Sequence, residues 1–161
     1  MSKIHEIESL SVSEVAQTMI FKTLWDRLPS KSFISGLWLR EYVRTPLWKN
    51  CFLHVLSVKE YPYMRYYFGN IVLCTPGEKS LYEQASEEER ISYALDIEEK
   101  SKGRSTANWD GVKSLQSDLI AQYKKSFPYT FKGIIGYKYS LAEIQAVTGY
   151  LNKLFWESFS K

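Results

Sequence analysis

The chain has 161 residues, of which 45% are hydrophobic and 24% are charged, and its net charge is +3. These values fit one globular domain over residues 1–161 and exclude a disordered chain or a small disulfide scaffold. The charge is too small to indicate a nucleic-acid partner by itself. No apolar run reaches membrane-span length and residues 1–6 are not a signal peptide, so we expect a cytoplasmic protein without a membrane partner.

Aromatic residues are frequent in this sequence, and charged residues are unevenly distributed along it. Phe, Tyr and Trp make up 16% of the residues, more than one small core can bury, so we expect aromatic area on the surface. Segment 22–49 has six basic and two acidic residues, a net charge of +4. Segment 78–99 has eight acids against two bases, and segment 100–161 has ten bases against four acids. An acidic helix face beside Lys-rich surface accounts for this pattern most simply.

The first helix is predicted over residues 11–28. Ser11 and Glu14 match a capping box, apolar residues then recur at helical spacing, and Pro29 ends the pattern. The following segment, Phe33–Val43, is short and apolar and contains a glycine. It fits a second short helix or an extended element equally well.

Two strands are predicted next, over Asn50–Tyr61 and Tyr63–Thr75, because both segments are rich in β-branched and aromatic residues. Either a turn at Tyr61-Pro62 or a two-residue loop at Gly69-Asn70 would give a hairpin. Pro76-Gly77 has turn chemistry and is expected to end the strand region.

Helices dominate the rest of the chain. Capping-box patterns predict helix starts at Ser80 and Ser86, and Trp109–Tyr123 has amphipathic spacing. Tyr129–Tyr139 is predicted to be a strand with two glycines, and a fourth capping box at Ser140 opens the C-terminal helix. Strands and helices do not alternate. The fold class is therefore α+β, with a small, mostly antiparallel sheet and four to five helices packed mainly on one face.

No catalytic residue, metal site or cofactor is predicted. His54 lies alone in a predicted strand, where a histidine is more often structural than catalytic. Cys51 and His54 would point to opposite faces of that strand, which disfavours zinc. Cys51 and Cys74 are expected to be buried free thiols. The spacing of Gly133 and Gly136 is read as two strand glycines rather than a phosphate clamp.

Three groups of residues are candidates for binding. The segment 61–68 would place tyrosines and an arginine on one strand face, where they suit base stacking or a protein interface. Two tryptophans lie among basic residues in segment 38–49, and a basic loop precedes the helix that starts at residue 109. The candidate residues are Trp38, Arg40, Arg44, Trp48, Tyr63, Arg65, Tyr67, Lys102 and Arg104.

The function predicted from these features is a non-enzymatic protein-interaction module, such as an accessory subunit, adaptor or inhibitor, that uses an aromatic and Arg-rich surface. The first alternative is a nucleic-acid-binding protein that uses the Tyr/Arg strand 61–68 and basic residues 100–138. The second is an enzyme whose dispersed site only the fold assembles. A protein partner is the leading expectation, and a homo-oligomer is kept open.

Overall fold

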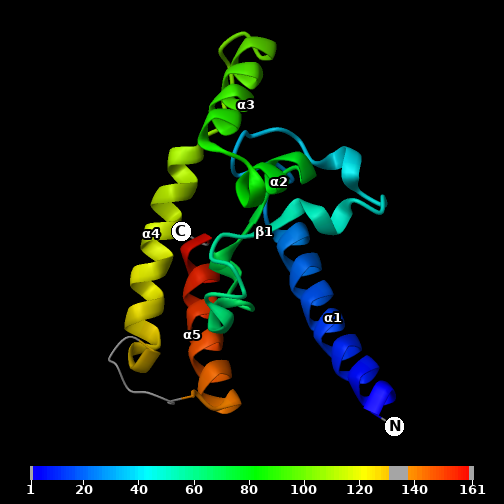
Figure 1. Ribbon diagram of the computed structural model, residues 1–161, viewed down its shortest axis with the longest axis vertical. Coiled ribbons are helices and arrows are strands. Elements are labelled where there is room, and N and C mark those ends of the chain that lie inside the picture. The colour runs from blue at the N-terminus through cyan, green and yellow to red at the C-terminus, as the bar shows by residue number, and fades with distance from the viewer. Residues whose placement is uncertain (1, 131–137, 160–161) are drawn as a thin grey trace.

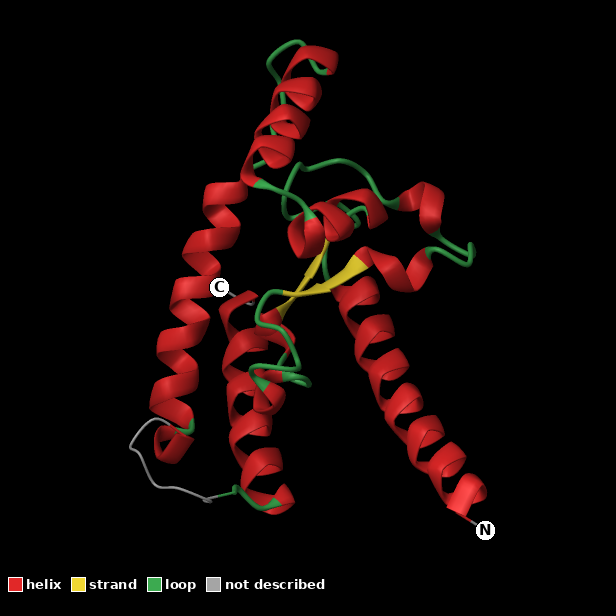
Figure 2. Cartoon of the chain, in the orientation of Figure 1, coloured by secondary structure: helices red, strands yellow, loops and turns green. Residues whose placement is uncertain are grey.

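The computed structural model describes residues 2–130 and 138–159 of the chain. Over these residues it has five α-helices and one two-stranded antiparallel sheet, which confirms the predicted α+β class (Figures 1 and 2). In the part of the chain that is described, no helix combines the length and apolar character needed to cross a bilayer. The elements are α1 (Ser2–Arg27), β1 (Phe52–His54), β2 (Ile71–Leu73), α2 (Pro76–Gln84), α3 (Glu87–Lys100), α4 (Trp109–Ser126) and α5 (Leu141–Phe159).

The two strands form a ribbon that is buried on both faces. Leu53 pairs with Val72, and both belong to a large core to which α2, α3, α4 and α5 contribute. The neighbouring pair, Phe52 and Leu73, faces a smaller core that contains residues of α1. This alternation follows from the period-two direction of strand side chains. Four helices therefore contribute to the core on one face, as predicted, and α1 covers the other together with Phe155 and Trp156 of α5. Helix α1 runs out from the ribbon towards the N-terminus (Figure 1).

Both strands are much shorter than predicted, and neither expected tight turn joins them. Residues 55–70 connect the strands, with 3₁₀ turns at Pro62–Met64 and Phe68–Asn70. The fully buried Asn70 closes this connection, because its Oδ1 accepts from Leu56 N at 2.7 Å and its Nδ2 donates to Leu56 O at 3.1 Å. The side-chain amide of Asn70 thus forms the hydrogen bonds that Leu56 N and Leu56 O would otherwise make to a neighbouring strand.

Two of the four helix starts predicted from capping boxes are wrong. Ser11 lies inside α1, because residues 2–27 contain neither proline nor glycine to stop a helix. Ser80 lies inside α2, which begins at Pro76 and is capped by Thr75 with Glu78. Thr75 and Glu78 have the same spacing as the predicted capping boxes, and Pro76 lies at the first helical position. Pro76-Gly77 therefore starts a helix, whereas the sequence predicted a turn there.

The other two capping boxes are confirmed. Ser86 Oγ accepts from Glu89 N at 3.2 Å at the start of α3. Ser140 Oγ accepts from Glu143 N at 3.1 Å, one residue before α5 begins. The predicted strand Tyr129–Tyr139 falls largely outside the described residues, and its first two residues belong to a 3₁₀ turn at Pro128–Thr130.

Glu78 is the most deeply buried charged side chain described, with no exposed surface. Its Oε1 accepts from Ser32 Oγ at 2.6 Å and from Thr75 N at 2.8 Å, and its Oε2 accepts from Tyr93 Oη at 2.7 Å. Burial raises the pKa of Tyr93, and the bond to Glu78 raises it further. One carboxylate thus joins the loop after α1, the start of α2 and the middle of α3.

The two cysteines are buried and free, as predicted. Cys74 N donates to Cys51 O at 2.9 Å, so the two residues extend the ribbon ladder beyond β1 and β2. Burial raises the pKa of Cys51 to about 11 and also raises the pKa of Cys74. Both side chains therefore stay neutral thiols in the folded protein at physiological pH and pack as small apolar groups.

We expect Glu78→Ala to lower the free energy of unfolding by about 3 kcal/mol, because it leaves buried donors of Ser32, Thr75 and Tyr93 without an acceptor. Urea denaturation followed by circular dichroism measures this loss. Glu83→Ala on the same helix removes an exposed carboxylate and should change stability by less than about 0.5 kcal/mol. Equal losses for the two variants would show that Glu78 does not hold the elements together.

Candidate functional site

Residues 30–39 form a closed loop between α1 and the ribbon. Ser32 N donates to Leu37 O at 2.8 Å, and Leu39 N donates to Ser30 O at 2.9 Å. Gly36 turns the chain with a φ of +75°, and Ser32 Oγ accepts from two backbone amides inside the loop. The two backbone bonds form a single antiparallel bridge between Lys31 and Trp38, and the serine bonds hold the turn between them. Segment 33–43 is therefore neither a second α-helix nor a full strand: Trp38 forms one bridge with Lys31, and residues 40–42 form a 3₁₀ turn.

The loop presents an exposed tryptophan between basic residues. Trp38 is 52% exposed, and the Lys31 Nζ and Arg40 Cζ atoms each lie 4.3 Å from the centre of its ring. Phe33, on the same loop, is 47% exposed. Cation–π contacts orient both cations around the ring. We call Lys31, Phe33, Trp38 and Arg40 the Trp38 surface.

The other two candidates in this region have different settings. Arg44 is exposed and has a φ of 63°, in a turn that follows the Trp38 surface. Trp48 is half-buried in the smaller core, where its ring meets Phe52 edge-on at 5.2 Å and Trp25 at 6.3 Å. Trp48 thus packs against the ribbon, whereas Trp38 faces outwards.

An apolar groove lies beside the Trp38 surface. It encloses about 470 Å³ between the end of α1, the ribbon, α4 and α5. Lys31 is the one charged residue among the described residues that line it. Phe33 and Lys31 belong both to this groove and to the Trp38 surface, so the two features form one continuous site. The other lining residues include Leu28, Pro29, Gly36, Ile71, Leu73, Leu115, Phe155 and Phe159.

The prediction of a strand at 61–68 is wrong. Pro62–Met64 is a 3₁₀ turn, so Tyr63, Arg65 and Tyr67 do not share a strand face. Tyr67 is only 7% exposed, and the half-buried Tyr63 ring lies 5.0 Å from Phe127 in an aromatic cluster. Arg65 Nη2 donates to Gln17 Oε1 of α1 at 3.4 Å. Pro62 breaks the ladder, and the rings gain more by entering the large core than by standing on an open strand.

The described basic residues of segment 100–138 are spread from the end of α3 through the following loop and along α4, to Lys138 ahead of α5. Lys102 and Arg104 are exposed in the loop that follows α3 and line neither the groove nor the Trp38 surface. Asn108 already caps α4, since its Oδ1 accepts from Gly111 N at 2.9 Å. The Gly133–Gly136 motif and Lys132 lie outside the described residues.

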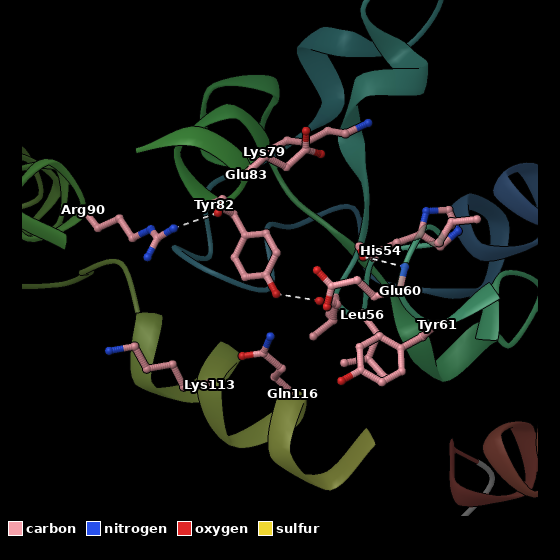
Figure 3. A pocket seen from close by; sticks show the side chains of 13 residues that line it. His54, Leu56, Glu60, Tyr61, Lys79, Tyr82, Glu83, Arg90, Lys113 and Gln116 are labelled. Atoms are coloured by element: carbon pink, nitrogen blue, oxygen red, sulfur yellow. Dashed lines mark hydrogen bonds between the residues drawn. The ribbon is translucent and has the colours of Figure 1, made fainter. Parts of the chain in front are cut away.

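A polar pocket opens between α2, α3, α4 and residues 54–61 and encloses about 640 Å³ (Figure 3). We call it the α2 pocket. Tyr82 stands in its middle and donates from Oη to Val55 O. Arg90 and Lys113 lie to one side of Tyr82 and Glu60 to the other (Figure 3). The charged residues that line it are three cations and two carboxylates: Lys79, Arg90, Lys113, Glu60 and Glu83.

His54 also lines the α2 pocket, but its ring is committed elsewhere. Its Nε2 lies 3.1 Å from Arg65 O, an acceptor, so this nitrogen carries the proton and donates. Burial lowers the pKa of His54 below 6.5, partly offset by that hydrogen bond. The ring is thus a neutral structural donor at physiological pH, and only Nδ1 retains a free lone pair.

Within residues 2–130 and 138–159, no three His, Cys, Asp or Glu side chains are clustered closely enough to hold a metal ion.

Comparison with family models, with curated proteins and with solved structures found no match to this chain.

Sequence reasoning identified Trp38 and Arg40 but not their neighbours. Lys31 and Phe33 could not be assigned to the same surface from the sequence. A closed loop has no regular spacing of apolar residues from which side-chain directions can be predicted. The α2 pocket was missed altogether. Lys79, Tyr82 and Glu83 have the spacing of one helix face, which was a usable signal, but their meeting with Lys113 depends on how α2 and α4 pack.

We expect Gly36→Ala to destabilise the fold by about 1–2 kcal/mol, because only the backbone conformation penalises a side chain there. A Cβ at Gly36 would meet no atom within 4 Å. Gly149→Ala, in the middle of α5 and equally free of contacts, should instead stabilise by about 0.5–1 kcal/mol. Chemical denaturation measures both, and the same sign for both variants would contradict the strained turn.

We expect protein stability to fall as the pH drops through the ordinary histidine range near 6.5. The lowered pKa of folded His54 means that the unfolded chain binds the extra proton first, so acid favours unfolding. His54→Gln keeps a donor for Arg65 O without titrating, and it should show a weaker pH dependence between about pH 7.5 and 5.5. Urea midpoints across this range provide the measurement, and identical slopes for both proteins would contradict the assignment.

Proposed function

We propose that this chain is a non-enzymatic protein-interaction module, an accessory subunit, adaptor or inhibitor, that binds its partner through the Trp38 surface. The observation that carries the proposal is an exposed tryptophan, contacted by two cations, at the edge of an apolar groove. Tryptophan and arginine are the residues most enriched at the energetic centres of protein interfaces.

The rigidity of the loop supports this role. Backbone bonds close the loop at Ser32 and Leu39, and Phe33 N also donates to Leu73 O of β2 at 2.7 Å. A surface that is ordered before binding loses little conformational entropy when a partner docks. The loop therefore has the properties of a preorganised recognition element rather than of a flexible connection.

The charge and shape of the site define the partner's chemistry. The lining of the groove is mostly apolar, with Lys31 as its one charged residue among those described, and segment 22–49 has a net charge of +4 from six basic and two acidic residues. A partner segment with a bulky apolar side chain flanked by Asp or Glu complements both features. A cytoplasmic setting, predicted from the sequence, belongs to the same proposal.

The nucleic-acid alternative has less support. The expected stacking strand at 61–68 is absent, and the Tyr67 ring is buried. Lys102 and Arg104 remain exposed, but they are not among the cations that contact the Trp38 ring. We keep nucleic-acid capture as an outcome of the test below.

We expect Trp38→Ala to weaken partner binding by about 2 kcal/mol or more, the loss typical of a hot-spot residue. A photo-crosslinking amino acid at position 33, introduced in the native cell, identifies the partner by mass spectrometry. Calorimetry with the purified partner then measures the affinity of each variant. Because Trp38 is half exposed, its removal should change the free energy of unfolding by less than about 0.5 kcal/mol.

Tyr150→Ala is the matched control, since Tyr150 is 63% exposed on α5 and does not line the groove. It should leave the affinity unchanged. Equal weakening by both variants would refute the Trp38 surface as the interface. Cross-links from position 33 to nucleic acid instead of protein would favour the alternative function.

A further inference from the structure

We propose that the α2 pocket binds a small phosphate monoester attached to a ring, of the size of a nucleoside monophosphate, with its phosphate on Arg90 and Lys113. This inference is independent of the Trp38 surface, which shares no lining residue with the pocket. The inference rests on three observations. Hydrogen bonds hold the Arg90 guanidinium in place without an acidic partner among the described residues, three cations line the pocket, and the volume of the pocket fits a small molecule.

Arg90 is a preorganised anion donor. Its Nε donates to Leu81 O at 3.1 Å and its Nη2 to Tyr82 O at 2.7 Å, at the end of α2. The guanidinium also lies 6.0 Å from the centre of the Tyr82 ring and 5.9 Å from that of Trp109. These contacts fix the guanidinium plane, so the remaining N–H groups form a fork of the kind that binds phosphate.

No carboxylate of the described residues forms an ion pair with Arg90. The half-buried guanidinium therefore has only carbonyl and ring partners: two of its five N–H groups donate to carbonyls, and no described carboxylate pairs with its charge. A bound phosphate would supply that charge in a site partly screened from water, where ionic hydrogen bonds are stronger.

Lys113 provides the second cation. Figure 3 shows its side chain on the same side of Tyr82 as Arg90, although the two residues come from different helices. Its Nζ lies 3.5 Å from Glu87 Oε1, and the two side chains are 60% and 74% exposed. Such an exposed pair contributes little and can yield to a phosphate dianion.

The rest of the pocket suits the body of the ligand. A volume of about 640 Å³ is far larger than a phosphate needs and falls in the range of small-molecule sites. Tyr61 and Tyr82 provide ring surfaces, and Gln116 and Glu60 provide acceptors for N–H or O–H groups. A ring with polar edges, such as a nucleobase with its sugar, matches these walls.

The carboxylates limit the ligand to one phosphate. Glu60 and Glu83 line the same pocket as the three cations, so the lining has only one net positive charge. Each further phosphate of a di- or triphosphate would bring more negative charge towards these carboxylates. The monoester should consequently bind more tightly than the triphosphate of the same nucleoside.

Titration of the full chain with nucleoside monophosphates, followed by amide chemical-shift changes, tests the proposal. The other probes are ribose 5-phosphate, inorganic phosphate and the matching triphosphates. Saturable shifts around Tyr82, Arg90 and Lys113 are expected with at least one monophosphate. No saturable shift with any phosphate monoester at millimolar concentration would overturn the proposal, as would tighter binding of the triphosphate. Equal affinity for inorganic phosphate would overturn the assignment of a ring.

Two substitutions test the residues. Lys113→Gln should weaken binding about tenfold or more with an unchanged thermal midpoint, since its side chain is exposed. Arg90→Lys should weaken it at least as much by losing the fork. Lys100→Gln removes a somewhat more exposed charge, paired with Asp96 at the far end of α3, and should leave the affinity unchanged. Equal weakening by Lys113→Gln and Lys100→Gln would overturn the site, because it would reduce the effect to net charge.

Discussion

The buried carboxylate of Glu78 is the interaction on which the arrangement of this protein depends. A charge without exposed surface is tolerated only when donors surround it, and here Ser32, Thr75 and Tyr93 supply them. The same group completes the capping box of α2 and anchors the loop that presents Trp38. Both candidate sites follow from this anchor: the loop lies on one side of it, and the next residues of α2 line the pocket.

The aromatic residues that stood out in the sequence serve mostly as core. Tyr63, Tyr123 and Phe127 form one cluster, and Phe21 stacks on Phe52 at 4.1 Å in another. The ribbon separates these two cores because its successive side chains point in opposite directions. A two-stranded ribbon is marginal by itself, so its burial on both faces explains how such a small sheet persists. Among the described residues, Trp38 differs in being an exposed aromatic residue with two cations against its ring.

The predictions succeeded where a local signal was sufficient and failed where a distant partner decided the outcome. Ser86 and Ser140 start helices as their capping boxes indicate, because the bonds involved span three residues. The same spacing at Ser11 and Ser80 was overridden by helices that begin earlier. The strands were overestimated because β propensity reports a fit to a pleated, half-buried surface, and residues 55–70 found that burial in turns closed by Asn70.

The sequence by itself determined the α+β class, the buried free thiols, the end of α1 and two helix starts. Composition, helix-breaking residues and short-range capping carry that information. Only the tertiary structure decided that Tyr67 is buried while Trp38 is exposed, and that Arg90 and Lys113 share a pocket. These outcomes depend on contacts between α2, α3 and α4 and on a carboxylate 46 residues from the serine it binds. Local sequence patterns do not predict such contacts, because the burial of a side chain depends on how distant segments pack together.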